Sequence, residues 1–310
     1  MKTILVTGAH GMLGHVVCRI LSRKHRVIGT CRGPQDSYPA LSGPPNSSGP
    51  AFSLIDRVDL TDPRTLAERL PGSGISFVVN CAGLIKQRPA ANDPMAVMQV
   101  NALMPLRLAQ WSEARGARLI HISTDCVFSG RRGGYRESDT PDPVDLYGLS
   151  KLLGEVGTAP HLTLRTSFIG PQLSGREGLL AWFLAQRGTI KGYAKAIFSG
   201  LTTTAFAEVI ERVIDGVLPL SGLYHVAAPP ISKYALLCEI ERRLQRGITI
   251  ERDDTFDCDR SLDGHRFVNA SGITVPGWDE MLDGLCNALD DGRQQQPDRS
   301  AVRWATGASP

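Results

Sequence analysis

The chain has 310 residues, of which 42% are hydrophobic and 21% charged, as in a typical soluble globular protein. A formal net charge of +3 is too small to favour nucleic acid or an anionic membrane surface as a partner. Seven scattered cysteines without a Cys-x-x-Cys pair, and apolar runs all shorter than about 18 residues, predict reduced thiols, no metal and no membrane span. The first residues lack a signal-peptide pattern, so we expect a cytoplasmic protein.

A short apolar run at residues 3–6 leads into Thr7-Gly-Ala-His-Gly-Met-Leu-Gly14, and a helical pattern follows through Leu21. Strand, glycine turn and helix are the context that a dinucleotide-binding site requires, with the diphosphate at the helix N-terminus. Gly8 permits a tight turn, Gly11 lets the backbone approach the diphosphate, and Gly14 lets the helix pack closely on the strand. His10 and His15 either add positive charge there or face solvent. The cofactor residues expected at this turn are Gly8, His10, Gly11, Met12, Leu13 and Gly14.

The next strand-like segment, residues 26–31, ends in Arg32 where an acidic residue would bind the ribose 2′-hydroxyl of NAD(H). An arginine accommodates a 2′-phosphate instead, which favours NADP(H). Residues 33–50 are too rich in Gly, Pro and Ser to pack and are expected to form a loop. Asp59 and Leu60, after a third strand, are expected to border the adenine.

A strand at residues 76–80 leads into Cys81, Ala82 and Gly83, small residues that would let the ribose on the nicotinamide side approach the backbone. A long helix is expected from residue 93 to residue 115 and contains Asn101. We place Asn101 with the cofactor residues, although a structural role that joins two backbone elements has at least equal weight.

The strand 119–122 ends in Ser123, Thr124 and Asp125, where open parallel sheets bind their ligands. Tyr147 and Lys151 are one helical turn apart and therefore lie on one face of a helix. A nearby ammonium would lower the pKa of the phenol toward the range useful for acid–base catalysis. The expected catalytic residues are Thr124, Tyr147 and Lys151, with the last two also touching the cofactor.

Strands alternate with helical stretches over residues 1–165, and the remaining sequence is mixed. We expect an α/β fold: a Rossmann-type doubly wound parallel sheet with a smaller mixed α/β substrate-binding lobe. Residues 1–170 would form the NADP-binding domain, with 198–226 returning to it. Residues 171–289 would form most of the substrate-binding lobe, and residues 290–310 a disordered tail.

Further motifs extend beyond the glycine turn: Ser123-Thr-Asp-x-Val-Phe128, Glu137-x-Asp139-x-Pro141, Tyr147-Gly-x-Ser-Lys-x-x-Gly-Glu155, Arg165-Thr166-Ser167, Gly222-Leu-Tyr-His-Val226, Arg260-Ser-Leu-Asp263, Arg266 and Pro276-x-Trp278. Through these motifs the chain resembles the extended short-chain dehydrogenase/reductases, most closely the dTDP-4-dehydrorhamnose reductase family, up to about residue 289. The resemblance implies reduction of a nucleotide-linked 4-keto-6-deoxy sugar at C4, with NADPH as the hydride source.

The resemblance also implies a role for each catalytic residue. Tyr147 would protonate the developing oxyanion, Thr124 would hydrogen-bond the same oxygen, and Lys151 would hold the ribose hydroxyls and lower the phenol pKa. Arg165, Thr203 and Arg266 would contact the sugar or its diphosphate. For Arg165 a salt bridge within the fold has comparable weight.

Cys126 departs from the family pattern. Related 4,6-dehydratases carry a Glu at this position, so the base for dehydration is missing, and rhamnose-type reductases usually carry a Tyr. Cys126 matches the acid–base cysteine of GDP-fucose synthase-like enzymes, but their partner histidine has no counterpart here. Cys126 is therefore either a packing residue or, in an epimerase or epimerase–reductase, an acid–base group.

A third reading is a regulatory subunit like that of methionine adenosyltransferase, which shares this fold and uses the cofactor structurally. The presence of Thr124, Tyr147 and Lys151 argues against it. No acidic cluster matches the metal site of some family members. The nucleobase, the product stereochemistry and the oligomeric state stay open, a homodimer being the commonest arrangement for soluble enzymes.

Overall fold

A computed structural model describes residues 1–38, 41, 52–70, 74–173, 178–216 and 220–294. Its centre is a seven-stranded sheet with the strand order β10-β6-β5-β4-β1-β2-β3, in which all neighbours are parallel. The strands are β1 (Thr3–Thr7), β2 (Arg26–Thr30), β3 (Ser53–Ile55), β4 (Phe77–Asn80), β5 (Arg118–Thr124), β6 (Leu162–Thr166) and β10 (Gly222–His225). The predicted doubly wound parallel sheet is confirmed.

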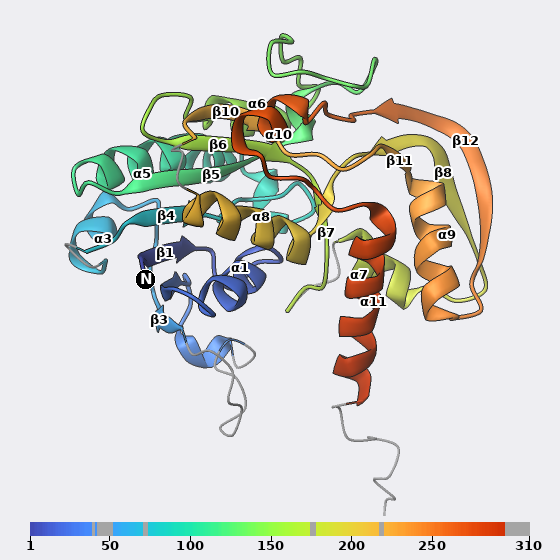
Figure 1. Ribbon diagram of the computed structural model, residues 1–310, viewed down its shortest axis with the longest axis horizontal. Coiled ribbons are helices and arrows are strands. Elements are labelled where there is room, and N and C mark those ends of the chain that lie inside the picture. Colours follow the sequence, from blue (N-terminus) through green and yellow to red (C-terminus); the bar gives the residue numbers. More distant parts are fainter. Residues whose placement is uncertain (39–40, 42–51, 71–73, 174–177, 217–219, 295–310) are drawn as a thin grey trace, which may run out of the picture.

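Helices cover both faces of this sheet, because successive side chains of a buried strand point to opposite sides. Ile4 and Val6 pack in one core with α1 (Gly14–Leu21) and α8 (Thr203–Asp215). Leu5, between them, packs in the opposite core with α5 (Met104–Glu113). The two helix layers are visible on either side of the strands in Figure 1.

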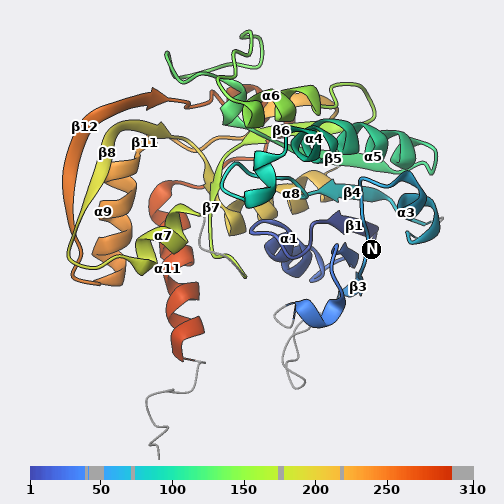
Figure 2. The same ribbon diagram turned by 180° about the vertical axis from the view of Figure 1, so that it is seen from behind.

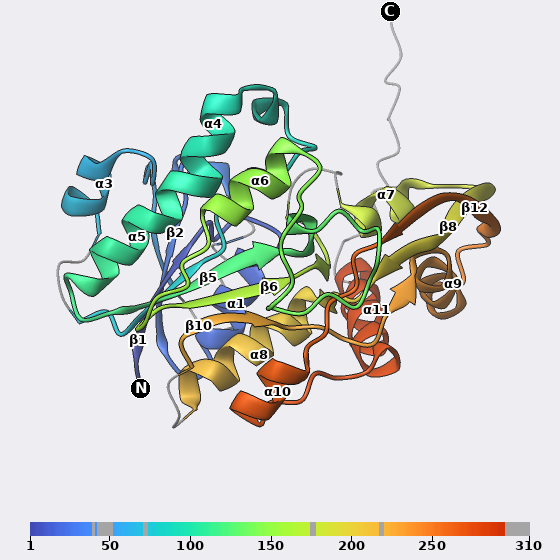
Figure 3. The same cartoon turned by 90° about the horizontal axis from the view of Figure 1, so that it is seen from above.

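Four helical segments complete the α5 side of the sheet. The short helix α3 (Pro63–Glu68) follows β3, and α6 (Leu146–Leu153) lies beside α4 (Pro94–Met98) and the π-helical segment η3 (Gln99–Leu103). The single helix expected over residues 93–115 is therefore α4, η3 and α5 in succession. Figure 3 shows α4, α5 and α6 together on one side of the strands.

A smaller unit lies beside the main sheet (Figure 2). Its three-stranded sheet has the order β11-β8-β12, formed by β11 (Ile231–Ser232), β8 (Thr189–Phe198) and β12 (Thr249–Asp259). One core unites it with α7 (Leu179–Ala185), α9 (Lys233–Leu244) and α11 (Trp278–Gln294). The remaining elements are the two-residue strands β7 (Phe168–Ile169) and β9 (Leu201–Thr202), helix α10 (His265–Ser271) and the short turns η1 (Gln35–Ser37), η2 (Pro89–Asn92) and η4 (Asp125–Val127).

The structure differs from the sequence expectation at two places in this unit. The pair β8 and β12 was not predicted, because β12 carries charged side chains on its exposed face and lacks a continuous apolar stripe. Helix α11 extends to Gln294, into the segment predicted to be a tail, and residues 295–310 lie outside the part that the structure describes.

Candidate active site

The glycine turn between β1 and α1 is compact because two of its glycines admit no side chain. Gly8 has φ +69°, which favours glycine, and a Cβ there would lie 2.9 Å from Ala82 Cα. A Cβ on Gly14 would overlap the carbonyl oxygen of Gly8, so α1 begins directly against the turn. The first turn of α1 carries no acidic residue, which leaves its N-terminus suited to an anion.

A cavity of about 640 Å³ opens beside this turn, a size suited to a cofactor. Gly14 and Asn101 were expected to contact the cofactor but do not belong to its lining. The predicted residues that do line it are Gly8, His10, Gly11, Met12, Leu13, Arg32, Asp59, Leu60, Cys81, Ala82, Gly83, Tyr147 and Lys151.

Asn101 does not line the cavity but bonds to backbone beside it. Its Oδ1 accepts a hydrogen bond from the Leu84 amide at 2.8 Å, and its Nδ2 donates to the Leu84 carbonyl at 2.9 Å and to Ser150 Oγ at 3.1 Å. These direct bonds tie the loop after β4 to α6. Asn101 is fully buried, and the structural alternative weighed for it describes its position best.

The outer end of the cavity is basic. Arg32, Arg88 and His10 all line it, and burial together with the charges of Arg88 and Arg32 lowers the pKa of His10. Tyr38 also lines the cavity: its ring centroid lies 4.7 Å from that of His10, and its hydroxyl accepts a hydrogen bond from Gly33 N at 3.1 Å.

Tyr38 and Arg88 were not predicted from the sequence to line the cavity. The segment of Tyr38 was expected not to pack, yet η1 turns the chain so that the ring meets His10; residues 39–40 and 42–50 of that segment lie outside the described residues. The sequence did offer one signal for these two residues. They are an aromatic and a basic side chain in the loops that follow β2 and β4, at the carboxyl edge of the sheet where ligands bind.

The inner end of the cavity holds two of the three expected catalytic residues, Tyr147 and Lys151, and Thr124 is near Tyr147 without lining the cavity. Asp145 caps α6 by accepting a hydrogen bond from Gly148 N at 2.8 Å, and this helix places Tyr147 and Lys151 on the cavity. The Thr124 hydroxyl, at the end of β5, donates to Asp125 Oδ1 at 3.2 Å and lies close enough to the Tyr147 phenol to act on its pKa. The ammonium of Lys151 donates to the carbonyl of Ile122 at 2.7 Å, and burial lowers its pKa to about 8.

The pKa of Tyr147 differs from the sequence expectation. Burial raises the pKa of this phenol, Cys126 and Asp125 raise it further, and the neighbouring Thr124 side chain lowers it only in part. Lys151 donates to the Ile122 carbonyl and is not among the groups that act on the phenol, so the expected lowering of the phenol pKa is not seen in this arrangement. A phenol with a raised pKa keeps its proton at neutral pH, as a proton donor must.

Cys126 lies next to this phenol. Burial and the neighbouring Asp125 raise the pKa of the thiol to about 12, although Arg260 Nη1 donates to Cys126 Sγ at 3.7 Å. The thiol is therefore neutral at physiological pH, whereas acid–base catalysis needs a substantial thiolate fraction. This environment favours the packing role.

Three cations near Cys126 were not assigned to a site from the sequence. Arg260 also donates through Nε to the Phe128 carbonyl at 2.9 Å. The Nζ atom of Lys86 lies 3.4 Å from Asp145 Oδ2, and the charge of Lys233 acts on buried Asp125. Arg260 and Lys233 come from the smaller unit and its margin, so both parts of the chain converge beside Tyr147.

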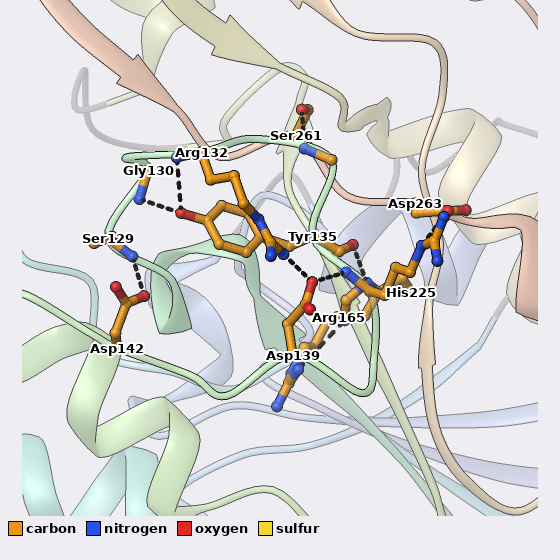
Figure 4. Close-up of polar contacts among 12 residues, drawn as sticks. Ser129, Gly130, Arg132, Tyr135, Asp139, Asp142, Arg165, His225, Ser261 and Asp263 are labelled. Atoms are coloured by element: carbon orange, nitrogen blue, oxygen red, sulfur yellow. Dashed lines mark hydrogen bonds and ion pairs between the residues drawn. The ribbon is translucent and has the colours of Figure 1, made fainter.

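Arg165 is held in an ion pair within the fold. Its guanidinium is 3% exposed and forms a bidentate ion pair with Glu155, at 2.8 and 2.7 Å. Its Nη1 donates to His225 Nε2 at 3.3 Å, and the two side chains lie together behind Tyr135 in Figure 4. The structure therefore shows the salt bridge within the fold that was the alternative role for Arg165.

Neither Thr203 nor Arg266 lines the cavity that contains Tyr147. Thr203 is the first residue of α8 and is fully buried. Arg266 is exposed, with its guanidinium 4.8 Å from the Tyr224 ring centroid. It lines a separate surface cavity of about 730 Å³, together with Arg136, Glu137, Ser138, Asp263, His265, Asn269 and Ala270.

Neither a metal centre nor a membrane-crossing helix is found in the part of the chain that the structure describes. No three His, Cys, Asp or Glu side chains are grouped there as metal ligands, and none of its helices is long and apolar enough to cross a membrane.

The sequence matches the family model of the RmlD substrate binding domain over residues 1–248. The chain belongs to the RmlD family. One similar protein is the probable low-salt glycan biosynthesis reductase Agl14 of Haloferax volcanii. It is 32% identical over 72% of this chain and 73% of its own length. Methionine adenosyltransferase 2 subunit beta of Danio rerio is 32% identical over 77% of this chain and 73% of its own.

Other RmlD-like matches are shorter or more distant. The dTDP-4-dehydrorhamnose reductase of Burkholderia thailandensis is 33% identical over 54% of this chain, and the match spans only 50% of its own length. The crystal structure of dTDP-4-dehydrorhamnose reductase from Bacillus anthracis, in complex with NADP, superposes with a TM-score of 0.74 at 22% identity, covering 93% of this chain and 99% of that one. This likeness establishes the shared fold.

Proposed function

We propose that this RmlD-family chain is an NADP(H)-dependent reductase of a nucleotide-linked 4-keto-6-deoxy sugar. The observation that carries the proposal is the arrangement along one cavity: a glycine turn and basic residues at its outer end, and Tyr147 with Lys151 at its inner end. The names of the relatives from Haloferax volcanii and Burkholderia thailandensis, both reductases, support the same chemistry.

NADPH, when bound, supplies the hydride that reduces the C4 ketone. Tyr147 holds a proton at neutral pH and gives it to the oxygen at which negative charge develops. Thr124, whose hydroxyl lies beside the phenol, turns its hydroxyl to the same oxygen and stabilises it. Lys151 donates its free N–H groups to the ribose hydroxyls while one N–H stays on the Ile122 carbonyl.

The glycine turn and basic end fit the cofactor. Gly8 and Gly14 leave no room for side chains, and Gly11 lies on the cavity, where its backbone can meet a diphosphate. Arg32 and Arg88 lie where a 2′-phosphate would extend beyond the adenosine ribose.

Changing Arg32 to Asp is expected to weaken NADPH binding about 10- to 100-fold, which corresponds to the loss of one charge-assisted hydrogen bond to the 2′-phosphate. NADH binding should weaken little or improve, because an acidic residue at this position can bind the 2′-hydroxyl. Titration of both reduced cofactors by fluorescence measures the two affinities. Arg26→Asp, at the exposed start of β2, is the matched control. Equal losses for both cofactors would refute the role of Arg32.

The substrate side is proposed to lie where the two parts of the chain meet. Arg260, Lys86 and Lys233 surround the position next to Tyr147, and a sugar bound there would place its diphosphate within their reach. In this arrangement residues 1–170 with 198–226 bind the cofactor, and residues 171–289 supply most of the substrate lobe.

The test is to mix purified protein with NADPH and dTDP-4-keto-6-deoxyglucose, with and without a 3,5-epimerase, and to follow the absorbance of the reduced nicotinamide. Consumption only with the epimerase present is the result expected for a dehydrorhamnose-type reductase. Consumption without it would mean that the protein accepts or epimerises the sugar itself, and the stereochemistry of the product would choose. No consumption of NADPH with UDP-, GDP- or dTDP-linked 4-keto sugars would overturn the proposal.

The role of Cys126 distinguishes a reductase from an epimerase. Because its thiol stays protonated, Cys126→Ala is expected to leave kcat within about threefold, the size of a minor packing change next to Tyr147. With sugar epimerised beforehand in H₂O and freed of the epimerase, turnover in D₂O should also incorporate no solvent deuterium at sugar carbons. Deuterium in the product, lost in Cys126→Ala, would instead establish acid–base catalysis by the thiol.

A regulatory subunit is the second candidate, favoured by the similarity to methionine adenosyltransferase 2 subunit beta. A binding role needs the cavity but not the Thr124 hydroxyl beside the Tyr147 phenol at its inner end. Turnover with any nucleotide sugar would reject this candidate. Tight cofactor binding without turnover, together with a stable complex with a methionine adenosyltransferase, would establish it.

A further inference from the structure

A row of polar side chains crosses the centre of the main sheet on the side of α6. Thr7 pairs with Asn80 in the β1–β4 register, and Asn80 pairs with His121 in the β4–β5 register. All three side chains are buried, with 0–1% of each residue exposed. Buried polar groups need hydrogen-bond partners, so the partners of this row define its protonation.

Asn80 has one possible orientation. The backbone N–H of Ala82 is necessarily a donor, and it points to Asn80 Oδ1 at 3.2 Å. The Thr7 hydroxyl donates to the same oxygen at 2.7 Å. The amide nitrogen, Nδ2, is thereby turned toward His121 Nδ1, at 3.0 Å.

This orientation fixes the tautomer of His121. An amide nitrogen only donates, so His121 Nδ1 must accept and carries no proton. Burial and the nearby charge of Lys151 lower the pKa of the imidazole, which is therefore neutral with its proton on Nε2. His121 Nε2 lies 3.5 Å from Lys151 Nζ, so an N–H group faces the lysine nitrogen.

We propose that His121 is a positioning residue for Lys151: its Asn80-locked Nε2–H holds the amine against the Ile122 carbonyl and disfavours its positive charge. Two donors that face one another repel, and this cost falls only on the ammonium form. Lys151 then exchanges a proton near neutral pH, beside Tyr147 in the same cavity. A role for this proton exchange in catalysis rests on the proposed reductase function, whereas the protonation state of Lys151 does not depend on that function.

The other groups around Lys151 do not produce this effect. Glu155, just beyond α6, and Cys81, beyond β4, both favour the ammonium, and Glu155 is already paired with Arg165. Tyr147 is the titratable neighbour on the same helix face. Asp125 and Cys126, from η4, act on Tyr147. Burial lowers the pKa of Lys151, and we attribute a further part of the lowering to the His121 N–H that faces its nitrogen.

The proposal is tested by ¹³C NMR of protein carrying ¹³Cε-lysine, with the Lys151 signal assigned from its loss in Lys151→Arg. In cofactor-free wild-type protein the Lys151 signal should titrate with a midpoint near the lowered pKa of about 8. His121→Gln should raise this midpoint by about one pH unit, a tenfold change in proton affinity, because a glutamine can turn its oxygen toward the ammonium. Asn80→Asp should also raise it, since a carboxylate accepts from Nδ1–H and leaves Nε2 free to accept from Lys151.

His161→Gln is the matched control. His161 is also a buried histidine, with Nδ1 accepting from Leu119 N at 3.1 Å, but its partners do not include Lys151. It should lower stability without moving the Lys151 midpoint. An unmoved or lowered midpoint in His121→Gln or in Asn80→Asp would overturn the proposal. Because the titration uses neither cofactor nor substrate, a failed turnover assay would reject the reductase function and leave this result standing.

Discussion

Tyr147→Phe is expected to lower kcat by about 10²–10⁴-fold, the usual contribution of a positioned general acid. The phenol is half-buried at the inner end of the cavity and keeps its proton at neutral pH, and the Thr124 hydroxyl lies beside it. Phenylalanine keeps the ring and removes only the hydroxyl, so the cavity wall is preserved. Steady-state turnover measures the loss, and fluorescence titration should give an unchanged NADPH affinity.

Tyr193→Phe is the matched control for this substitution. Tyr193 is an exposed residue of β8 whose ring packs on Phe256, 5.2 Å between centroids, and it does not line the cavity. Its variant should retain full turnover. If Tyr147→Phe kept kcat within a few fold of wild type, the proton would have to come from another group and the assignment of Tyr147 would be wrong.

The parts of the site that depend on backbone geometry were predictable from the sequence. Gly8 and Gly14 are required by a close approach of backbone to backbone, so their spacing identified the turn before its contacts were seen. Tyr147 and Lys151 face one cavity because helical spacing alone brings them to one side of α6.

Residues that reach the site through tertiary contacts were not predictable in this way. Tyr38 meets His10 only because η1 redirects a segment without an apolar pattern, and Arg260 reaches Cys126 from a position 134 residues further along the chain. His121 stood in an apolar strand with no sign of its neighbours on β4 and α6. Its contacts with Asn80 and Lys151 follow from strand order, which the sequence does not specify locally.

Arg165 shows how one motif can suit two partners. It lies near the carboxyl end of the buried strand β6, where substrate-binding residues are common, and its family motif gave the same expectation. A guanidinium at that depth requires a carboxylate, and Glu155 lies one helix-to-strand connection earlier in the chain. The Glu155 carboxylate also accepts a hydrogen bond from Ser123 Oγ at 2.6 Å, so the ion pair joins β5, β6 and the end of α6.

Arg165→Met is therefore expected to lower the free energy of unfolding by about 3–5 kcal/mol, because it leaves the buried Glu155 carboxylate without its partner. His225 loses the donor at its Nε2 as well, while its Nδ1–H still donates to the Tyr135 carbonyl at 3.0 Å. Denaturant unfolding measures the change, and Arg266→Met, on an exposed side chain, should stay within about 0.5 kcal/mol.

A second substitution distinguishes a structural Arg165 from a substrate contact. Adding Glu155→Gln to Arg165→Met removes the unpaired charge and should recover most of the lost stability, since replacing both members of a buried pair is often nearly neutral. The double variant should regain turnover together with stability if Arg165 serves the fold. Recovered stability with turnover still reduced by 100-fold or more would mean that the guanidinium contacts the substrate after all, and that the ion pair with Glu155 opens when the sugar nucleotide binds.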